Sequence, residues 1–251
     1  GVVYHIYPLG YCGAPEKNDF RSEPEARIHE ITQRLDEIAR MGFNTIYLGP
    51  VFESTQHGYD TADYRTVDRR LGSNRNVREL VDEAHGKGIR VLLDGVFNHV
   101  GRDFWAFQDV LANRENSPYV SWFRDLRFDG DNRFRDGLTY HGWEGAEELV
   151  TLNLDEPAVA THLLDAVAQA IDELDIDGFR LDVAYLLPRP FLAGLRRRVE
   201  QSKPGALLLG EVIHGDYESY LSPDLLDSVT NYQAYKGLWS SHNDRNYFEI
   251  A

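Results

Sequence analysis

The amino-acid sequence predicts an α/β fold, a (β/α)8 TIM-type barrel that is incomplete, with about six of its eight βα units present. Short apolar segments alternate along the chain with segments of helical periodicity, which is typical of right-handed βαβ units on a parallel sheet. Several apolar segments are continuously hydrophobic, as expected for parallel strands covered on both faces. No G-x-G-x-x-G or P-loop motif follows any of them, so a barrel is favoured over an open nucleotide-binding sheet.

Six segments carry the strand signal. They are short and apolar, and they occupy residues 2–7, 44–48, 89–97, 177–183, 206–213 and 226–232. The fourth contains Arg180 and Asp182, which lie two positions apart and would therefore point to the same side of a strand. A cation and an anion on one face of a buried strand need a specific reason.

Helical periodicity fills the intervals between these strands. Apolar residues at spacings of three and four predict helices over 28–38, 77–84, 159–171 and 192–199. Ser22 and Glu25 ahead of the first fit a capping box, and the third is expected to begin at Pro157. Asp175 and Asp177 precede the fourth strand and are expected to cap and solvate its start.

Residues 100–150 interrupt this rhythm. The segment is polar and aromatic, and beyond a helix near 103–113 it has no regular pattern. An excursion of this length inside a compact domain is typical of a functional insertion or small subdomain. We therefore divide the chain into residues 1–99 with strands 1–3, an inserted subdomain at 100–150, and residues 151–251 with strands 4–6.

The strand count leaves two barrel units unaccounted for. A complete barrel takes about 250 residues, and more with insertions. Here the inserted segment uses part of the 251 residues, and the chain ends inside what is predicted to be the sixth helix. It also begins without Met. We expect a barrel that lacks its last two units and has a cropped N-terminus.

Charge and composition argue against several classes of partner. The chain has 26 Lys and Arg against 41 Asp and Glu, a net charge of -15, which disfavours nucleic acid and anionic membranes. The single cysteine, Cys12, excludes an internal disulfide and gives a zinc cluster little support. No apolar run approaches the ~20 residues that span a bilayer. The location stays open, with a soluble, cytoplasmic protein slightly favoured.

Polar and charged side chains gather at the carboxyl ends of four predicted strands. They are His57, Tyr59, Asp60 and Asp63 after the second strand, Asp94, Asn98 and His99 after the third, Arg180 and Asp182 in the fourth, and Glu211 after the fifth. In a parallel barrel these ends converge on one rim, where active sites are built from several strands. The sequence therefore predicts an active site at this rim.

Two of these carboxylates, Asp182 and Glu211, lie on consecutive strands beside an arginine. Arg180 is expected to hold Asp182 ionised, and the apolar segment before Glu211 is expected to favour its protonated form as a proton donor. Adjacent strands lie ~4.8 Å apart, which allows the carboxyl separation of about 5 Å used in retaining glycoside hydrolysis. A purely structural ion pair is the less favoured interpretation, because buried ion pairs cost desolvation energy.

Five motifs occur in order along the chain: "HGYDTADYRTVDRRLG" (57–72), "DGVFNH" (94–99), "LVTLNLDEP" (149–157), "GFRLDVAY" (178–185) and "GEVIH" (210–214). Together they resemble the alpha-amylase family, glycoside hydrolase family 13. The second, fourth and fifth resemble its first three signature regions, the first resembles the segment after its second strand, and the third resembles a short motif that ends its inserted subdomain. The resemblance runs from residue 2 to about residue 232.

The resemblance implies a retaining glycosidase that acts on α-glucosidic bonds of α-glucans or maltooligosaccharides. Asp182 would be the nucleophile, Glu211 the general acid/base, and Arg180 the group that orients Asp182. Substrate binding falls to four further residues, with Tyr59 as the aromatic platform: His57, Tyr59, Asp94 and His99. The chemistry would need no cofactor. Asn98 matches a ligand of the structural calcium in many family members.

Two departures from the family pattern leave alternatives open. Nothing matches the fourth signature, a His-Asp pair after the seventh strand whose Asp is the third catalytic carboxylate, and we expect that group to lie beyond residue 251. His242 and Asp244 follow the sixth strand and are not assigned to it. Tyr185 and Leu186 replace a Lys-His pair found in many amylases, which weakens the calcium assignment.

The alternatives are a transglycosylase or isomerase of the same family, a related protein that binds without catalysis, and an inactive fragment that lacks the third carboxylate. Most aromatic residues of 100–150 are expected to pack in the insertion's own core, and Trp143 is a candidate for stacking on a sugar ring.

Overall fold

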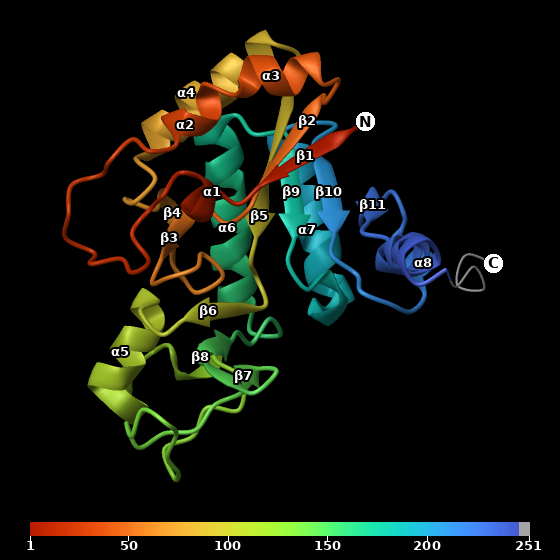
Figure 1. Ribbon diagram of the computed structural model, residues 1–251. Coiled ribbons are helices and arrows are strands. Elements are labelled where there is room, and N and C mark those ends of the chain that lie inside the picture. Colours follow the sequence, from red (N-terminus) through yellow and green to blue (C-terminus); the bar gives the residue numbers. More distant parts are fainter. Residues whose placement is uncertain (246–251) are drawn as a thin grey trace.

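A curled sheet of six parallel strands forms the centre of the molecule (Figure 1). The computed structural model describes residues 1–245, so the predicted end of the last barrel segment, 246–251, lies outside the described residues. The strands of the sheet, in spatial order, are β1 (Val3–Ile6), β2 (Thr45–Leu48), β5 (Arg90–Gly95), β9 (Gly178–Leu181), β10 (Leu207–Gly210) and β11 (Ser228–Val229). All six lie within predicted segments, and every neighbouring pair is parallel, which confirms an incomplete barrel.

Helices pack on the outer face of this sheet and bury its apolar side chains (Figure 1). They are α2 (His29–Thr32), α3 (Leu35–Arg40), α4 (Asn74–Gly86), α6 (Pro157–Leu174) and α7 (Arg189–Ser202). Each contributes apolar residues from one stripe, such as Leu80 of α4 and Leu195 of α7, which are fully buried. A further helix, α8 (Tyr232–Asn243), follows β11.

One predicted helix start is confirmed and another is wrong. Helix α6 begins at Pro157 as predicted, where proline needs no hydrogen-bond partner for its nitrogen. The predicted capping box of Ser22 and Glu25 is wrong, because the Glu25 N–H bonds to the Arg69 carbonyl and keeps this stretch outside any helix. The predicted helix over 28–38 is split into α2 and α3.

An antiparallel hairpin after β2 was not predicted. Its strands are β3 (Phe52–Ser54) and β4 (Thr61–Val67), and the loop between them carries several of the candidate rim residues. A short helix, α1 (Pro8–Tyr11), was also missed. The strand β3 has only three residues, and burial along the seven residues of β4 does not alternate, so neither strand gives a clear period-two signal.

The inserted segment has a three-stranded antiparallel sheet of its own in the order β6–β8–β7. Its elements are β6 (His99–Gly101), α5 (Trp105–Asn113), the 3-10 turns η1 (Arg114–Asn116) and η2 (Val120–Trp122), β7 (Gly142–Trp143) and β8 (Ala146–Thr151). The predicted boundaries at residues 100 and 150 fall inside β6 and β8. We propose a subdomain that runs from β6 through β8.

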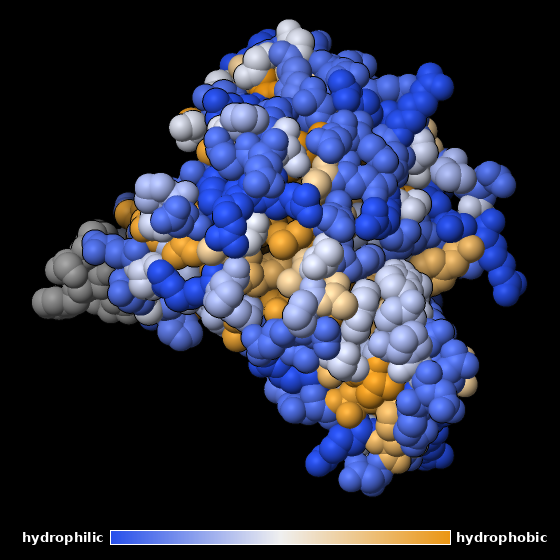
Figure 2. Space-filling model, turned by 180° about the vertical axis from the view of Figure 1, so that it is seen from behind, coloured by the Kyte–Doolittle hydropathy of each residue, from blue (hydrophilic) through white to orange (hydrophobic). Residues whose placement is uncertain are grey.

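The surface agrees with the acidic composition. Figure 2 shows a mostly hydrophilic face with hydrophobic residues in separate patches. Within residues 1–245, no helix is both long and apolar enough to cross a membrane. The remaining short elements are η3 (Ala184–Leu186) and η4 (Tyr217–Tyr220), which follow β9 and β10.

Candidate active site

Neighbouring strands bring four charged side chains together at the carboxyl end of the sheet. Asp94 lies near the end of β5 and is paired in register with Arg180 of β9. Asp182 follows β9 directly, and Glu211 follows β10. Asp94, Arg180 and Asp182 are buried, and Glu211 is partly buried. The parallel register therefore places these groups side by side, as the sequence predicted.

One guanidinium group holds all three carboxylates. Arg180 Nη1 lies 2.8 Å from Asp94 Oδ1 and 2.9 Å from Asp182 Oδ1, and Arg180 Nη2 lies 2.8 Å from Glu211 Oε1. Burial opposes its charge and is the largest single effect, but Asp94, Tyr47 and Asp182 together outweigh burial and hold the pKa of Arg180 above its ordinary value. One cation facing three acids in a nearly dry site leaves a surplus of negative charge.

That surplus overturns the expectation that Arg180 holds Asp182 ionised. Burial first, and then the negative charge of Asp94, raise the pKa of Asp182 to about 7, although Arg180 acts in the opposite direction. The sequence places Arg180 beside Asp182 alone, whereas in the folded chain Asp94 and Glu211 share the same guanidinium.

Asp94 has a second partner that the sequence analysis missed. The hydroxyl of Tyr47, from β2, donates a hydrogen bond to Asp94 Oδ2. The Tyr47 ring stacks on His5 of β1 with 4.3 Å between the ring centroids. Tyr47 and His5 belong to segments that have the pattern of ordinary apolar strands. The local sequence therefore does not identify them as site residues.

Glu211 is fixed by two more donors. The Val183 backbone N–H donates to Glu211 Oε2 at 3.0 Å, and the Tyr232 hydroxyl donates to Glu211 Oε1 at 3.1 Å. Val183 has φ 41° and ψ 46°, a left-handed conformation that a β-branched residue rarely adopts. Such strain concentrates at functional sites, and here it accompanies an N–H that contacts a carboxylate of the site.

The loop between β3 and β4 presents His57 and Tyr59. Asp60 holds this loop by accepting hydrogen bonds from the backbone N–H groups of Gln56 (2.8 Å), His57 (3.1 Å) and Gly58 (3.1 Å). The Tyr59 N–H donates to His57 Nδ1 at 3.2 Å. Asp60 is therefore a support for the loop, and its carboxylate faces the backbone.

His99 is buried beside the charged group and lacks a partner for one ring nitrogen. Its Nε2 atom makes no hydrogen bond to any described residue and lies 3.9 Å from Asp182 Oδ2. Burial, with His57 adding to it, lowers the pKa of His99 to about 4, so the ring is neutral at pH 7. The Asn98 side-chain nitrogen lies 3.2 Å from His99 Nδ1, and a hydrogen bond with the Tyr59 backbone acts against burial on the pKa of the ring.

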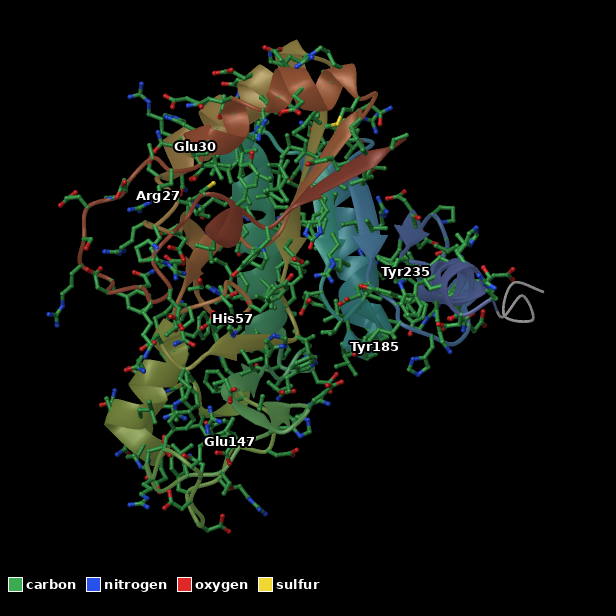
Figure 3. All side chains as sticks on the ribbon, in the orientation of Figure 1. Arg27, Glu30, His57, Glu147, Tyr185 and Tyr235 are labelled. Atoms are coloured by element: carbon green, nitrogen blue, oxygen red, sulfur yellow. The ribbon has the colours of Figure 1, made fainter. Side chains whose placement is uncertain are left out.

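A cavity of about 450 Å³ opens over these residues. Its lining includes most of the predicted site and several residues from the insertion and the loops after β9 and β10: His57, Tyr59, His99, Trp143, Glu144, Leu149, Arg180, Asp182, Val183, Tyr185, Glu211 and Ile213. Figure 3 labels His57 and Tyr185 on separate elements of this region. Asp94 lies beneath the cavity floor, and Asp63 lies outside the lining.

Asn98 is the residue that matches a calcium ligand of the family. Its carbonyl accepts the Leu152 N–H, and its side-chain nitrogen faces His99. Calcium takes six to eight oxygen ligands, but no group of three or more His, Cys, Asp or Glu residues within residues 1–245 could hold a metal ion. Because calcium also binds Asn and backbone carbonyl oxygens, the expected calcium stays a prediction, and no step below uses one.

The sequence model for "Alpha amylase, catalytic domain" matches residues 26–250. The chain belongs to the alpha-amylase family. It is 36% identical over 245 residues to a cyclomaltodextrinase of Thermoanaerobacter pseudethanolicus, covering 92% of this chain and 42% of that protein. It is 36% identical over 221 residues to the intracellular maltogenic amylase of Bacillus subtilis, covering 87% of this chain and 36% of the relative.

Solved structures of the family have the same fold. The cyclic alpha-maltosyl-(1-->6)-maltose hydrolase of Arthrobacter globiformis, in complex with that sugar, aligns with a TM-score of 0.85 and 31% identity, over 97% of this chain and 57% of that one. A debranching enzyme of Nostoc punctiforme aligns with a TM-score of 0.84 and 32% identity, over 99% of this chain and 56% of its own. The chain spans about two fifths of the length of the curated relatives and somewhat over half of the solved chains.

Proposed function

We propose that this protein is a retaining glycoside hydrolase that cleaves α-glucosidic bonds of α-glucans or maltooligosaccharides. The observation that carries the proposal is the shared contact of Asp182 and Glu211, from consecutive strands, with one guanidinium group. Retaining enzymes hold their two carboxyl groups about 5 Å apart, and the shared guanidinium keeps Asp182 and Glu211 close together. The substrates in the relatives' names support an α-glucan or oligosaccharide as the partner.

In the first step, a carboxylate oxygen of Asp182 attacks the anomeric carbon of the bound sugar. The bond from that carbon to the glycosidic oxygen breaks, and Glu211 gives its proton to the departing oxygen. A glycosyl ester on Asp182 results. Arg180 stabilises the negative charge that shifts from Asp182 to Glu211, because it contacts both groups.

In the second step, Glu211 takes a proton from water, and the water oxygen attacks the same carbon from the opposite side to Asp182. The ester bond breaks, Asp182 leaves as a carboxylate, and the sugar keeps its α configuration. The fixed Val183 N–H and Tyr232 hydroxyl keep Glu211 in place during both transfers.

The sugar that forms the ester is bound, on this proposal, by His57, Tyr59 and His99, whereas Asp94, predicted as a fourth sugar ligand, lies beneath the cavity floor and holds Tyr47 and Arg180. Tyr59 lines the cavity and offers a ring face, and His99 Nε2 offers a buried ring nitrogen without a protein partner. An unpaired buried polar atom costs about 1–3 kcal/mol, and a sugar hydroxyl would satisfy it.

We further propose that the protein is cytoplasmic and does not bind nucleic acid or membranes. The support is the net charge of -15 and the relative named as an intracellular maltogenic amylase. Expression of a fluorescent fusion from the complete gene would test the location.

A covalent trap tests the reaction. The protein expressed from its complete gene is incubated with 5-fluoro-α-glucosyl fluoride, digested and analysed by mass spectrometry. The proposal expects the sugar on Asp182, with no label on an Asp182→Asn variant. A label on another residue, or a β-configured first product in proton NMR, would contradict it. Transfer products that outweigh glucose and maltose would favour the transglycosylase alternative instead.

A further inference from the structure

The loop between β3 and β4 is fixed through its backbone carbonyls as well as its N–H groups. Arg70 Nη1 donates to the Gln56 carbonyl at 2.8 Å, and the Tyr7 hydroxyl donates to the His57 carbonyl at 2.9 Å. The N–H groups of the same two residues donate to the Asp60 carboxylate. Side chains of the protein therefore bind both polar backbone groups of residues 56 and 57.

Arg70 is almost wholly buried, with 4% of its surface exposed, and it belongs to the segment that follows β4. Its Nε atom lies 2.9 Å from Asp68 Oδ1, and its Nη2 atom lies 2.6 Å from Asp68 Oδ2. Its Nη1 atom also donates to the carbonyls of Pro15 and Glu16, at 3.1 Å each. One side chain thus joins the loop after β3 to the loop that follows α1.

Stability alone is a weak reason for this arrangement. Burying a guanidinium and a carboxylate costs desolvation energy, and such a pair often contributes little compared with packed apolar side chains. The pair does supply fixed geometry, because the planar guanidinium binds several acceptors in set directions. A loop that only joined β3 to β4 could leave its carbonyls to water. The fixed backbone therefore matters for what the loop presents to the cavity, which is His57 and Tyr59.

We propose that Arg70 and Tyr7 are positioning residues of the sugar site. They hold the backbone of residues 56 and 57, so that the side chains of His57 and Tyr59 keep their place in the cavity. Neither Arg70 nor Tyr7 belongs to the cavity lining, so both act through the loop. This inference rests on the hydrolase function proposed above, because it says how the site for the ester-forming sugar is kept in shape.

The first test removes the fork of Arg70 and keeps its charge, in the protein expressed from its complete gene. In Arg70→Lys a cation remains beside Asp68, but one ammonium group cannot replace all the contacts of the guanidinium. We expect kcat/KM for maltotetraose to fall at least about tenfold, because small displacements of binding groups are costly. Reducing-sugar release measures this loss.

The matched control is Arg196→Lys. Arg196 is also a buried arginine, and it donates to the carbonyls of Leu225 and Ala206 at 2.9 Å and 3.3 Å, near the amino end of β10 and away from the rim. The thermal midpoints of both lysine variants should fall by a few degrees. The control should keep kcat/KM within about twofold of the unaltered protein, and an equal loss of kcat/KM in the two variants would overturn the inference.

A double-mutant cycle separates positioning from general destabilisation. Arg70→Lys is introduced into a protein that already carries His57→Ala and Tyr59→Ala. In that protein the loop has no side chain left to place against the sugar, so Arg70→Lys should lower kcat/KM by less than about twofold. A merely structural role would give the same fold-loss with and without the two side chains, and that result would overturn the inference.

Tyr7→Phe decides the inference if Arg70→Lys does not fold. Tyr7 is partly exposed at the surface, and the change removes only the hydroxyl that binds the His57 carbonyl. We expect kcat/KM for maltotetraose to fall about threefold to fivefold, the effect of one neutral hydrogen bond, with no further loss in the protein that lacks both loop side chains. An unchanged kcat/KM, or an equal loss in both proteins, would overturn the inference.

If the unaltered protein does not cleave maltotetraose, the proposed hydrolase function fails instead. Calorimetric binding of maltotetraose to the unaltered and Arg70→Lys proteins, or to Tyr7→Phe where Arg70→Lys does not fold, then decides the inference. Weaker binding to the variant supports it, and equal or absent binding overturns it.

Discussion

Strand β9 has an aspartate at each end, and the two have opposite environments. Asp177 precedes the strand and Asp182 follows it. Burial opposes ionisation of Asp177, but hydrogen bonds from the Val91 N–H, His85 and Lys203 outweigh it and lower the pKa of Asp177. For Asp182, burial and the negative charge of Asp94 outweigh the opposing effect of Arg180 and raise the pKa to about 7.

The contacts explain the difference. At the amino end, Asp177 Oδ2 lies 2.8 Å from His85 Nε2, and Asp177 Oδ1 lies 3.1 Å from Lys203 Nζ, so two basic groups, which also contact Asp175, face this acid. At the carboxyl end, three acids share the single guanidinium of Arg180. The contacts of Asp177 stabilise the fold. The contacts of Asp182 leave an excess of negative charge at the place where the proposed chemistry needs a reactive carboxylate.

The largest effect should come from the carboxyl end. Asp182→Asn removes the proposed nucleophile, so we expect kcat/KM on maltooligosaccharides to fall at least about 10³-fold. Reducing-sugar release from purified protein measures it, with circular dichroism as the control for folding. A loss of kcat/KM of less than tenfold would mean that Asp182 is not the nucleophile. It would also contradict the proposed difference in role between Asp177 and Asp182.

The amino end should respond in the opposite way. Asp177→Ala leaves the Val91 N–H unpaired and Lys203 with fewer partners, so the free energy of unfolding should fall by about 2 kcal/mol. The stabilisation from ionised Asp177 is present above about pH 4 and is lost as pH falls through its lowered native pKa. Urea unfolding measures the loss, and kcat/KM of the folded variant should stay within about twofold. A large activity loss without destabilisation would contradict the structural role.

A smaller effect concerns pH. Since the proposed nucleophile must be ionised, kcat/KM should fall as pH drops below about 7, the pKa of Asp182. Asp94→Asn removes the acid that raises this pKa, so the acid limb of the profile should move down by about one pH unit while the activity maximum decreases. A limb that stays in place or moves up would show that Asp94 does not set the pKa of Asp182.

The sequence predicted all six barrel strands and the rim residues, because parallel buried strands and motif order leave clear local patterns. It did not predict the β3–β4 hairpin, because β3 has only three residues and burial along β4 does not alternate. For Asp175 and Asp177 it predicted capping and solvation. Asp175 does end α6, in a left-handed conformation, but both residues join an ion network with His85 and Lys203 from distant helices.

The site was predictable in its members but not in its electrostatics. Arg180 and Asp182 are neighbours in sequence, and their pairing suggested an ionised nucleophile. The sign of the pKa shift of Asp182 depends on burial, which only the packed barrel creates, and on Asp94, which lies 86 residues before Arg180. Tyr47 and Tyr232 were missed for the same reason, since their hydroxyls reach the carboxylates only after the strands are assembled.

The most direct test of the difference between Asp177 and Asp182 is a comparison of two proteins, the unaltered one and Asp182→Asn. Their free energies of unfolding are measured between pH 4.5 and 8. A native pKa above the unfolded value of about 4 means that the unaltered protein loses stability as pH rises toward 7. The variant has no such loss, so its relative stability should grow up to about pH 7 and then level off. A constant difference, or one that shrinks as pH rises, would contradict the account.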